Sequence, residues 1–331
     1  MIALVRTEIT RLRWRRAVLV LLAAAVVVPL LIAAGTAWST RPYSDAEVAQ
    51  ATELARSQPG FDREVRRCEK HPRRTGVADA ADCEAQITEW WSGLYRKPLD
   101  LRDQLRESSI GAASVLLALV VLMGTTFAGA DWASGSMSNQ LLFEPRRLRV
   151  WLAKGTAVGL VATLLSAVVM TLYWLVLAGV AASRDIAPPP GVTGEIAWQV
   201  ARSTFLAAVG AGAGYALTML SRSTVFTLGV VFAVSAAGTG LVAALPLGDE
   251  KERWFPPTNL LAVLQGRATY YRPPPAECSL PGADPAAWDA AMRQMCNGTG
   301  FVTLWQGLAY VLVPVVLVVV LSVWSFRRRD V

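Results

Sequence analysis

The feature that most constrains this chain is a series of six long apolar stretches with no charged residue near their centres. An α-helix needs about 20 apolar residues to cross the hydrocarbon core of a bilayer. The stretches cover residues 17–37, 110–130, 151–183, 198–220, 225–247 and 302–326. Only 17% of the residues are charged and the mean hydropathy is +0.38, values that do not suit a soluble protein of this length. The sequence therefore predicts an all-α integral membrane protein with six transmembrane helices.

The positive charges predict how these helices are oriented. Arginine and lysine are concentrated in the N-terminal segment 1–16, the loop 131–150, the turn 221–224 and the tail 327–331, which share one side of a six-helix protein. Positively charged flanks stay in the cytoplasm, so we expect both termini there. The Ala, Val and Arg bias points to a bacterial cell membrane. Because the positive excess is divided among membrane flanks, a nucleic-acid partner is disfavoured.

The N-terminal segment 1–16 has the pattern of a helix lying on the membrane surface. Its apolar residues Ile2, Val5, Ile9 and Leu12 recur at helical spacing among arginines, as in interfacial amphipathic helices. Two alternatives are a basic flank that only sets orientation and a signal peptide with residues 17–37 as its apolar core. Secretory cores are about 7 to 15 residues long, which is shorter than this one.

Three segments should lie outside the cell: residues 38–109, 184–197 and 248–301. The first has two helical stretches, one with Ser44 as a candidate N-cap, and predicts a small helical domain. Its aromatic residues Trp90, Trp91 and Tyr95 form either the core of that domain or contacts with lipid headgroups. In the segment 248–301, prolines bracket an apolar stretch too short to span a bilayer, which predicts a hairpin or a short helix at the interface.

All four cysteines fall in the external segments. Cysteines confined to an oxidising exterior favour disulfides. Each long loop holds two, so we expect the pairs Cys68–Cys83 and Cys278–Cys296 over the other pairings that four cysteines allow. Zinc binding is the rival prediction, but the sequence has no Cys-x-x-Cys spacing and one histidine.

Several function classes are disfavoured by what the sequence lacks. It contains no G-x-x-x-x-G-K-[ST] phosphate-binding loop, and one histidine in a basic loop cannot supply a catalytic triad or a His-Glu-x-x-His motif. We therefore expect no enzymatic activity, no cofactor and no metal in this chain. Ion-coupled carriers usually need an ionisable group inside the membrane, whereas only Arg202, near the start of the fourth span, approaches that position.

Small residues and prolines within the spans predict how the helices pack. Gly210 and Gly214 form a small-x-x-x-small pair, which permits close helix packing. Pro29 and Pro314 each remove a backbone hydrogen bond and allow a kink.

The loop between the second and third spans carries the most ordered polar pattern of the chain, "GADWASGSMSNQLLFEPRRLRVWLAKG". It resembles the corresponding cytoplasmic loop of ABC-2-type transporter permeases, which has an acid, Gly-Thr, paired leucines, a proline, an arginine and a lysine. The matching residues here are Asp131, Gly135, Ser136, Leu141, Leu142, Pro145, Arg147 and Lys154. Asp131 stands where Glu is more usual, Ser136 where Thr is, and the spacing from proline to lysine is one residue short.

This resemblance implies the membrane subunit of an ATP-driven exporter. It implies a separate ABC ATPase that binds ATP and Mg, and a second permease chain, the same or related. The residues it assigns to ATPase coupling are Asp131, Gly135, Ser136, Pro145, Arg146, Arg147 and Lys154. The alternatives are an ordinary basic loop that anchors two helices, and, for the whole protein, a sensor or scaffold that binds an external ligand without transport. The cargo stays open among drugs, peptides, lipids and glycans.

Overall fold

The computed structural model describes residues 1–274, 278, 292 and 296–328. The chain divides into two compact units. The membrane unit comprises Met1–Ala34 and Leu101–Val331, and the small unit comprises Gly35–Asp100. The sequence placed the whole of residues 38–109 in an external domain, but residues 101–109 belong to the membrane unit, where the short helix α6 (Leu101–Gln104) precedes the second long helix.

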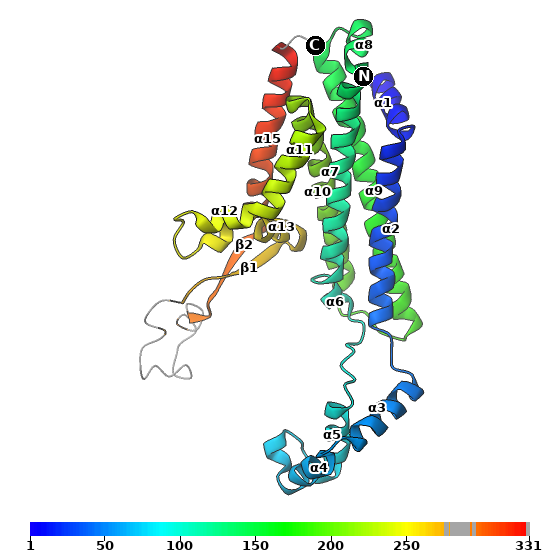
Figure 1. The fold of residues 1–331 in the computed structure, drawn as a ribbon, viewed down its shortest axis with the longest axis vertical. Coiled ribbons are helices and arrows are strands. Elements are labelled where there is room, and N and C mark those ends of the chain that lie inside the picture. Colours follow the sequence, from blue (N-terminus) through cyan, green and yellow to red (C-terminus); the bar gives the residue numbers. More distant parts are fainter. Residues whose placement is uncertain (275–277, 279–291, 293–295, 329–331) are drawn as a thin grey trace. The chain divides into compact units, whose positions relative to one another are not determined.

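Six helices in the described part of the chain are long and apolar enough to cross a membrane, which agrees with the six transmembrane helices predicted for a mainly helical chain. Figure 1 shows them in sequence colours. The fifth is interrupted by a π-helical turn, Ala233–Ala237. Their bounds are α2 Arg16–Ser39, α7 Ser108–Ala133, α9 Arg147–Ser183, α10 Val192–Ser221, α11 Thr224–Phe232 with α12 Gly238–Ala244, and α15 Leu304–Arg328. Pro29 and Pro314 lie inside α2 and α15.

Helix α10 is the centre of the membrane unit and packs against α7, α9 and α15. Two of its glycines, Gly210 and Gly214, lie where α7 approaches closely. A Cβ atom at Gly214 would lie 2.7 Å from the carbonyl oxygen of Val121, and one at Gly210 would lie 2.5 Å from Leu117 Cδ1. Because these glycines have no side chains, α10 and α7 can pack closely. Van der Waals attraction between closely packed helices stabilises their association in lipid, where no hydrophobic driving force acts between helices.

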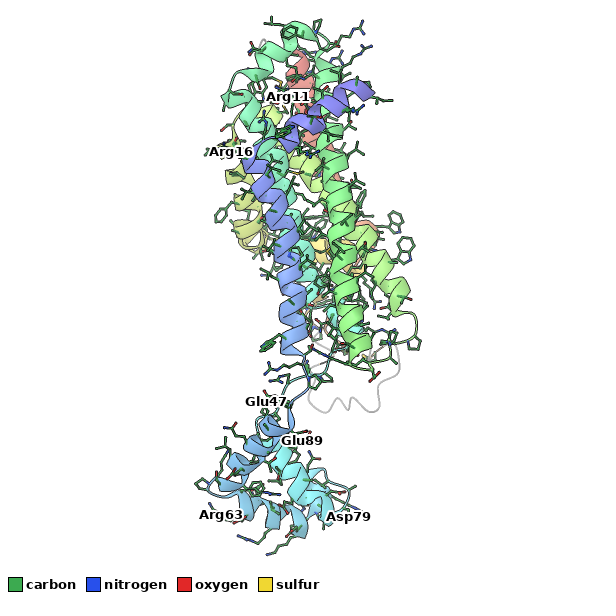
Figure 2. The ribbon with its side chains drawn as sticks, turned by 90° about the vertical axis from the view of Figure 1, so that its right-hand side faces the viewer. Arg11, Arg16, Glu47, Arg63, Asp79 and Glu89 are labelled. Carbon is green, nitrogen blue, oxygen red and sulfur yellow. A yellow bond between two sulfur atoms is a disulfide. The ribbon has the colours of Figure 1, made fainter. Side chains whose placement is uncertain are left out.

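The N-terminal helix α1 (Ile2–Arg13) runs at an angle to α2, as Figure 2 shows around Arg11 and Arg16. It packs against α9 and buries two residues one helical turn apart, Glu8 and Leu12, each only 1% exposed. The apolar stripe predicted from the sequence therefore faces protein at Leu12, while Ile2 is 87% exposed.

The connection between α7 and α9 contains a further helix, α8 (Ser136–Phe143). Gly135 precedes it with φ +68°, a left-handed conformation that costs about 1–2 kcal/mol for other residues. This glycine turns the chain between α7 and α8, and Pro145 stands in the link to α9.

In its described residues, the segment before the last span contains a 3₁₀ turn (Lys251–Trp254), a short helix and two strands. Helix α13 (Pro256–Gln265) leads through Gly266 into β1 (Arg267–Tyr271), which pairs antiparallel with β2 (Thr299–Thr303). Alternate residues Ala268, Tyr270 and Val302 are buried. The predicted short helix is present, but the strand pair was not expected in an all-α chain. Its partners lie about 30 residues apart in sequence, so local pattern does not show the pairing.

The small unit has three helices, α3 (Asp45–Ser57), α4 (Phe61–Lys70) and α5 (Cys83–Trp91), with 3₁₀ turns at Pro72–Thr75 and Ala80–Asp82. Ser44 caps α3 as predicted, in a capping box with Glu47. Trp91 packs on the buried Phe61 with ring centroids 5.9 Å apart, whereas Trp90 and Tyr95 are exposed. The core interpretation therefore holds for Trp91 alone.

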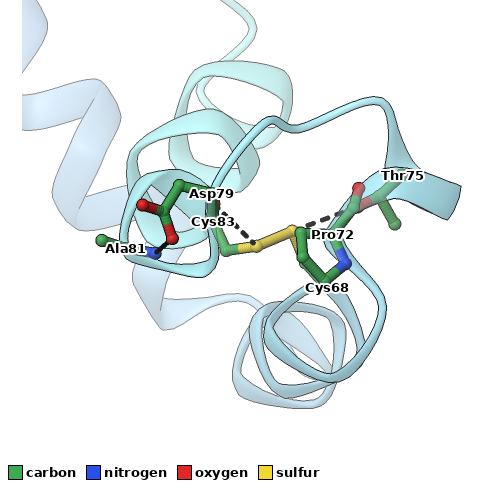
Figure 3. Close-up of a disulfide and its surroundings, with 6 residues drawn as sticks. All are labelled: Cys68, Pro72, Thr75, Asp79, Ala81 and Cys83. Carbon is green, nitrogen blue, oxygen red and sulfur yellow. Dashed lines mark hydrogen bonds between the residues drawn. A yellow bond between two sulfur atoms is a disulfide. The ribbon is translucent and has the colours of Figure 1, made fainter.

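Both predicted disulfides are present. Cys68 at the end of α4 is bonded to Cys83 at the start of α5, with Cα atoms 5.7 Å apart. Figure 3 shows the Thr75 hydroxyl donating a hydrogen bond to Cys68 Sγ beside the bridge. Cys278 is bonded to Cys296, with Cα atoms 5.6 Å apart. Because each thiol is used in a disulfide, none of the four is free to bind zinc.

Candidate functional site: a buried ion cluster joining four helices

Three charged side chains meet inside the membrane unit where α1, α7 and α9 come together. The ammonium of Lys154 donates hydrogen bonds to Glu8 Oε2 at 2.8 Å and to Asp131 Oδ2 at 2.5 Å. All three residues are 0–1% exposed. Lys154 therefore bridges a carboxylate from the N-terminal helix and a carboxylate from the second span.

Further donors form hydrogen bonds with the remaining oxygen of each carboxylate. Asp131 Oδ1 accepts hydrogen bonds from Arg15 and from the Ser136 hydroxyl, the latter at 2.6 Å. Glu8 Oε1 accepts from Gln140 Nε2 at 2.6 Å and from Arg11 at 3.4 Å. All four carboxylate oxygens are thus hydrogen-bonded. Because Ser136 and Gln140 belong to α8, the cluster ties four helices together.

The cluster resists separation for an electrostatic reason. Buried charges are costly unless they are paired and hydrogen-bonded, and removing one partner of a buried pair costs about 3–5 kcal/mol. The ring of Phe127 lies beside two of the cluster's cations, with Lys154 Nζ 5.3 Å and Arg15 Cζ 5.2 Å from its centroid. Arg15 also donates to the carbonyl of Phe127 at 3.1 Å. Moving α1, α7 or α9 away would leave a charge without its partner, and moving α8 away would remove one hydrogen bond from each carboxylate.

The structure brings together three of the residues that the sequence assigned to this loop: Asp131, Ser136 and Lys154. Gly135 contributes the turn before α8. Of the other assigned residues, Pro145 and Arg146 lie in the link to α9, and Arg147 is the first residue of that helix. Arg146 is exposed on the surface.

Sequence reasoning missed Glu8, Arg11, Arg15 and Gln140. One signal for Glu8 was available. At 100° per residue it falls on the same helical stripe as Val5 and Leu12, so an acidic residue lay on the face predicted to be apolar. Nothing in the sequence showed which cation it meets, because Lys154 is 146 residues away.

Beyond the cluster, α8 ends in two large apolar side chains that project from the surface. Leu142 is 81% exposed and Phe143 is 90% exposed. We call these two exposed apolar residues, Leu142 and Phe143 at the C-terminal end of α8, the α8 tip. Contiguous exposed apolar surface of sufficient area marks contacts with proteins or with a membrane.

Because every carboxylate oxygen of the cluster accepts a hydrogen bond, the arrangement is that of a structural contact that holds helices together. Comparison with family models, with curated proteins and with solved structures finds no match for this chain.

Proposed function

We propose that this chain is the permease subunit of an ABC-2-type exporter, which forms the translocation path as a dimer and is driven by a separate ATPase chain. The observation that carries the proposal is the ion cluster of Glu8, Asp131 and Lys154. It joins α1 to two helices long enough to span a membrane, α7 and α9, and hydrogen bonds from Ser136 and Gln140 attach α8 to its carboxylates.

The cluster gives a physical route for force. Helix α8 is joined covalently to α7 at one end and to α9 at the other, and through Ser136 and Gln140 it is hydrogen-bonded to the cluster. A push on α8 therefore moves α7, α9 and α1 as one body, because parting them would strand buried charges. The positive-inside pattern assigns this end of the membrane unit to the cytoplasm of a bacterial cell, where an ATPase would meet it.

The α8 tip supports a protein partner on that side. Leu142 and Phe143 offer an apolar anchor, and Arg146, exposed in the adjoining link, offers charge for acids on the partner. An apolar centre with a charged rim is the usual anatomy of a protein interface. ATP and Mg would bind to that partner, and α8 of this chain would transmit the partner's movement to the membrane helices.

The fifth and sixth spans support a second permease chain. In the most apolar window of each helix, 50% of α10 is buried within the chain, but only 6% of the Thr224–Ala244 span and 11% of α15. A second copy packed along these helices would cover them. Val234 lies on the exposed fifth span and Leu164 on α9, with 56% and 66% exposure. Because all native cysteines are in disulfides, Val234→Cys should crosslink into dimers while Leu164→Cys stays monomeric.

The test of the function uses the full chain purified from native membranes. Mg-dependent ATP hydrolysis should copurify with the parent chain and with Ile2→Ala, an exposed apolar residue on α1. It should be lost with Leu142→Ala and Phe143→Ala together, since anchor residues of an interface contribute about 2 kcal/mol or more each.

Two results would contradict the proposal. One is copurification that is unchanged by the double substitution at the α8 tip. The other is a partner that copurifies but neither hydrolyses ATP nor moves any solute in reconstituted vesicles. The second result would favour the sensor or scaffold, for which the compact, disulfide-bonded small unit is the supporting feature.

A further inference from the structure

A polar cavity opens at the end of the membrane unit opposite α8, between the start of α7, the first turns of α10 and the end of α13. Its volume is about 290 Å³. The lining residues are Leu105, Arg106, Glu195, Trp198, Gln199, Arg202, Leu264 and Gln265. Two of the three charged residues are arginines, and the one acid, Glu195, is already paired with Arg102 at 3.3 Å.

Neither cavity arginine has a side-chain hydrogen bond or ion pair to another residue within the described parts of the chain. Arg106 is exposed at the rim and Arg202 is half-buried. The guanidinium of Arg202 lies against Gly266, where a Cβ atom would come within 2.7 Å of Nη1. This places it at the C-terminal end of α13. A helix C-terminus carries about half a negative charge, which offsets part of the arginine charge and leaves the cavity positive.

A buried amide provides a second, independent sign of a ligand. Gln199 is 2% exposed, and its Nε2 donates to the carbonyl of Leu105 at 2.8 Å. Its Oε1 has no hydrogen-bond partner among the described residues. An unpaired buried acceptor costs about 1–3 kcal/mol. The cavity is therefore lined by two guanidinium groups, those of Arg106 and Arg202, and by one amide oxygen, Gln199 Oε1, that lacks a hydrogen-bond donor among the described residues.

The depth of the cavity indicates where the ligand comes from. At 1.5 Å per residue, Arg202 lies about 28 Å along α10 from its last residue, Ser221, close to the ~30 Å thickness of the hydrocarbon core. At the Ser221 end, Arg222 stacks on Trp132 with 4.6 Å from Cζ to the ring centroid. At the Arg202 end, Trp198 is 66% exposed. Tryptophan is enriched at both membrane interfaces, so Arg202 lies at the level of lipid headgroups.

We propose that Arg106, Gln199 and Arg202 bind a phosphate-bearing headgroup, that of a membrane lipid in the leaflet opposite α8. The two guanidinium groups would donate to the phosphate oxygens, a geometry that arginine matches better than lysine. Gln199 Oε1 would accept a hydrogen bond from a headgroup hydroxyl. The inference requires that α10 spans a bilayer, and it does not depend on the transport proposal.

The experiment is native mass spectrometry of the delipidated full chain in detergent, titrated with phosphatidylglycerol, which carries both a phosphate and hydroxyls. Arg106→Gln and Arg202→Gln should each weaken the tightest binding about tenfold or more, because each removes charge-assisted hydrogen bonds. Arg202→Lys should bind at an intermediate level. Arg184→Gln is the matched control, since Arg184 lies at the same end of the unit but does not line the cavity.

The second arm of the experiment titrates the chain with glycerol 3-phosphate and with inorganic phosphate. It shows whether the bound phosphate group belongs to a lipid or to a soluble compound. If these solutes bind in an arginine-dependent way and phosphatidylglycerol does not, the lipid assignment is overturned. If phosphatidylglycerol binds equally to the parent chain, Arg106→Gln and Arg202→Gln, the site itself is overturned. Because Arg106 is exposed, its substitution keeps the test valid even if Arg202→Gln fails to fold.

Discussion

Replacing Lys154 by methionine tests whether the ion cluster holds α1 on the membrane unit. Methionine is close to lysine in length but leaves the carboxylates of Glu8 and Asp131 buried beside each other without the ammonium that joins them. Asp131 keeps Arg15 and Ser136, whereas Glu8 keeps the weaker contacts to Arg11 and Gln140. We therefore expect α1 to be the element that separates.

The magnitude follows from the burial of the pair. Losing one partner of a buried ion pair costs about 3–5 kcal/mol, which corresponds to roughly a hundredfold to several thousandfold in an opening equilibrium. Leu12, which is 1% exposed on the packed face of α1, marks the position that such an opening uncovers. In a Leu12→Cys chain the introduced thiol is the one unpaired cysteine, since the native ones form disulfides.

The assay is the rate at which a membrane-impermeant maleimide labels this introduced thiol in inverted vesicles. Adding Lys154→Met should accelerate labelling by roughly the factor above, and adding Glu8→Gln as well should restore part of the protection because the stranded carboxylate is gone. Arg253→Met is the control, because it breaks an ion pair with Glu250 in which both side chains are more than a third exposed, and such pairs contribute about 0–1 kcal/mol. Labelling that Lys154→Met leaves unchanged would refute the role of the cluster in holding α1.

Three further predictions follow from other parts of the chain. Gly214→Ala should destabilise the membrane unit by about 1–3 kcal/mol through overpacking, because its Cβ would lie 2.7 Å from the Val121 carbonyl oxygen. Gly212→Ala is the control, because a Cβ atom there meets open space. Unfolding of both variants in detergent measures the difference, and equal stability would contradict the close α7–α10 contact. Hydrogen bonds, first from the Ser44 backbone and then from Arg96, hold the pKa of Glu47 at about 2 instead of 4.5. The folded-state pKa is lowered, so its contribution to stability is present above pH 4.5 and is lost as the pH falls toward 2. Thermal unfolding of the small unit should show a smaller loss across this window in Glu47→Gln, and identical pH profiles would count against it. A reporter fused after residue 331 should be cytoplasmic and one inserted near Gly76 external, and labelling of both from the same side of intact cells would overturn the predicted topology.

Two features of the loop between α7 and α9 decide how it should be tested. Gly135→Pro is an unsuitable probe of the α7–α8 turn, because Gly135 has φ +68° and proline is fixed near −65°. That substitution would disrupt the turn itself and could not isolate coupling. The exposed pair Leu142 and Phe143 is the better probe, because its replacement leaves the buried cluster intact.

Features that depend on local composition and spacing could be predicted from the amino-acid sequence. The six spans follow from runs of apolar residues long enough to cross a bilayer, and the N-cap at Ser44 follows from its place just before a helical stretch. The within-loop disulfides follow from the distribution of the cysteines between two loops. The resemblance of the loop between the second and third spans also pointed to Asp131, Ser136 and Lys154, which lie within 24 residues of one another.

Which residues these side chains contact depends on how distant helices pack together. Glu8 and Lys154 are distant in sequence, and only the packing of α1 on α9 brings them to 2.8 Å. The pairing of β1 with β2 and the convergence of Arg106, Gln199 and Arg202 on one cavity likewise join distant segments. The physical reason is that local pattern fixes which face of a helix is apolar, whereas the partner of a buried charge is fixed by which other helix supplies the opposite charge at that point.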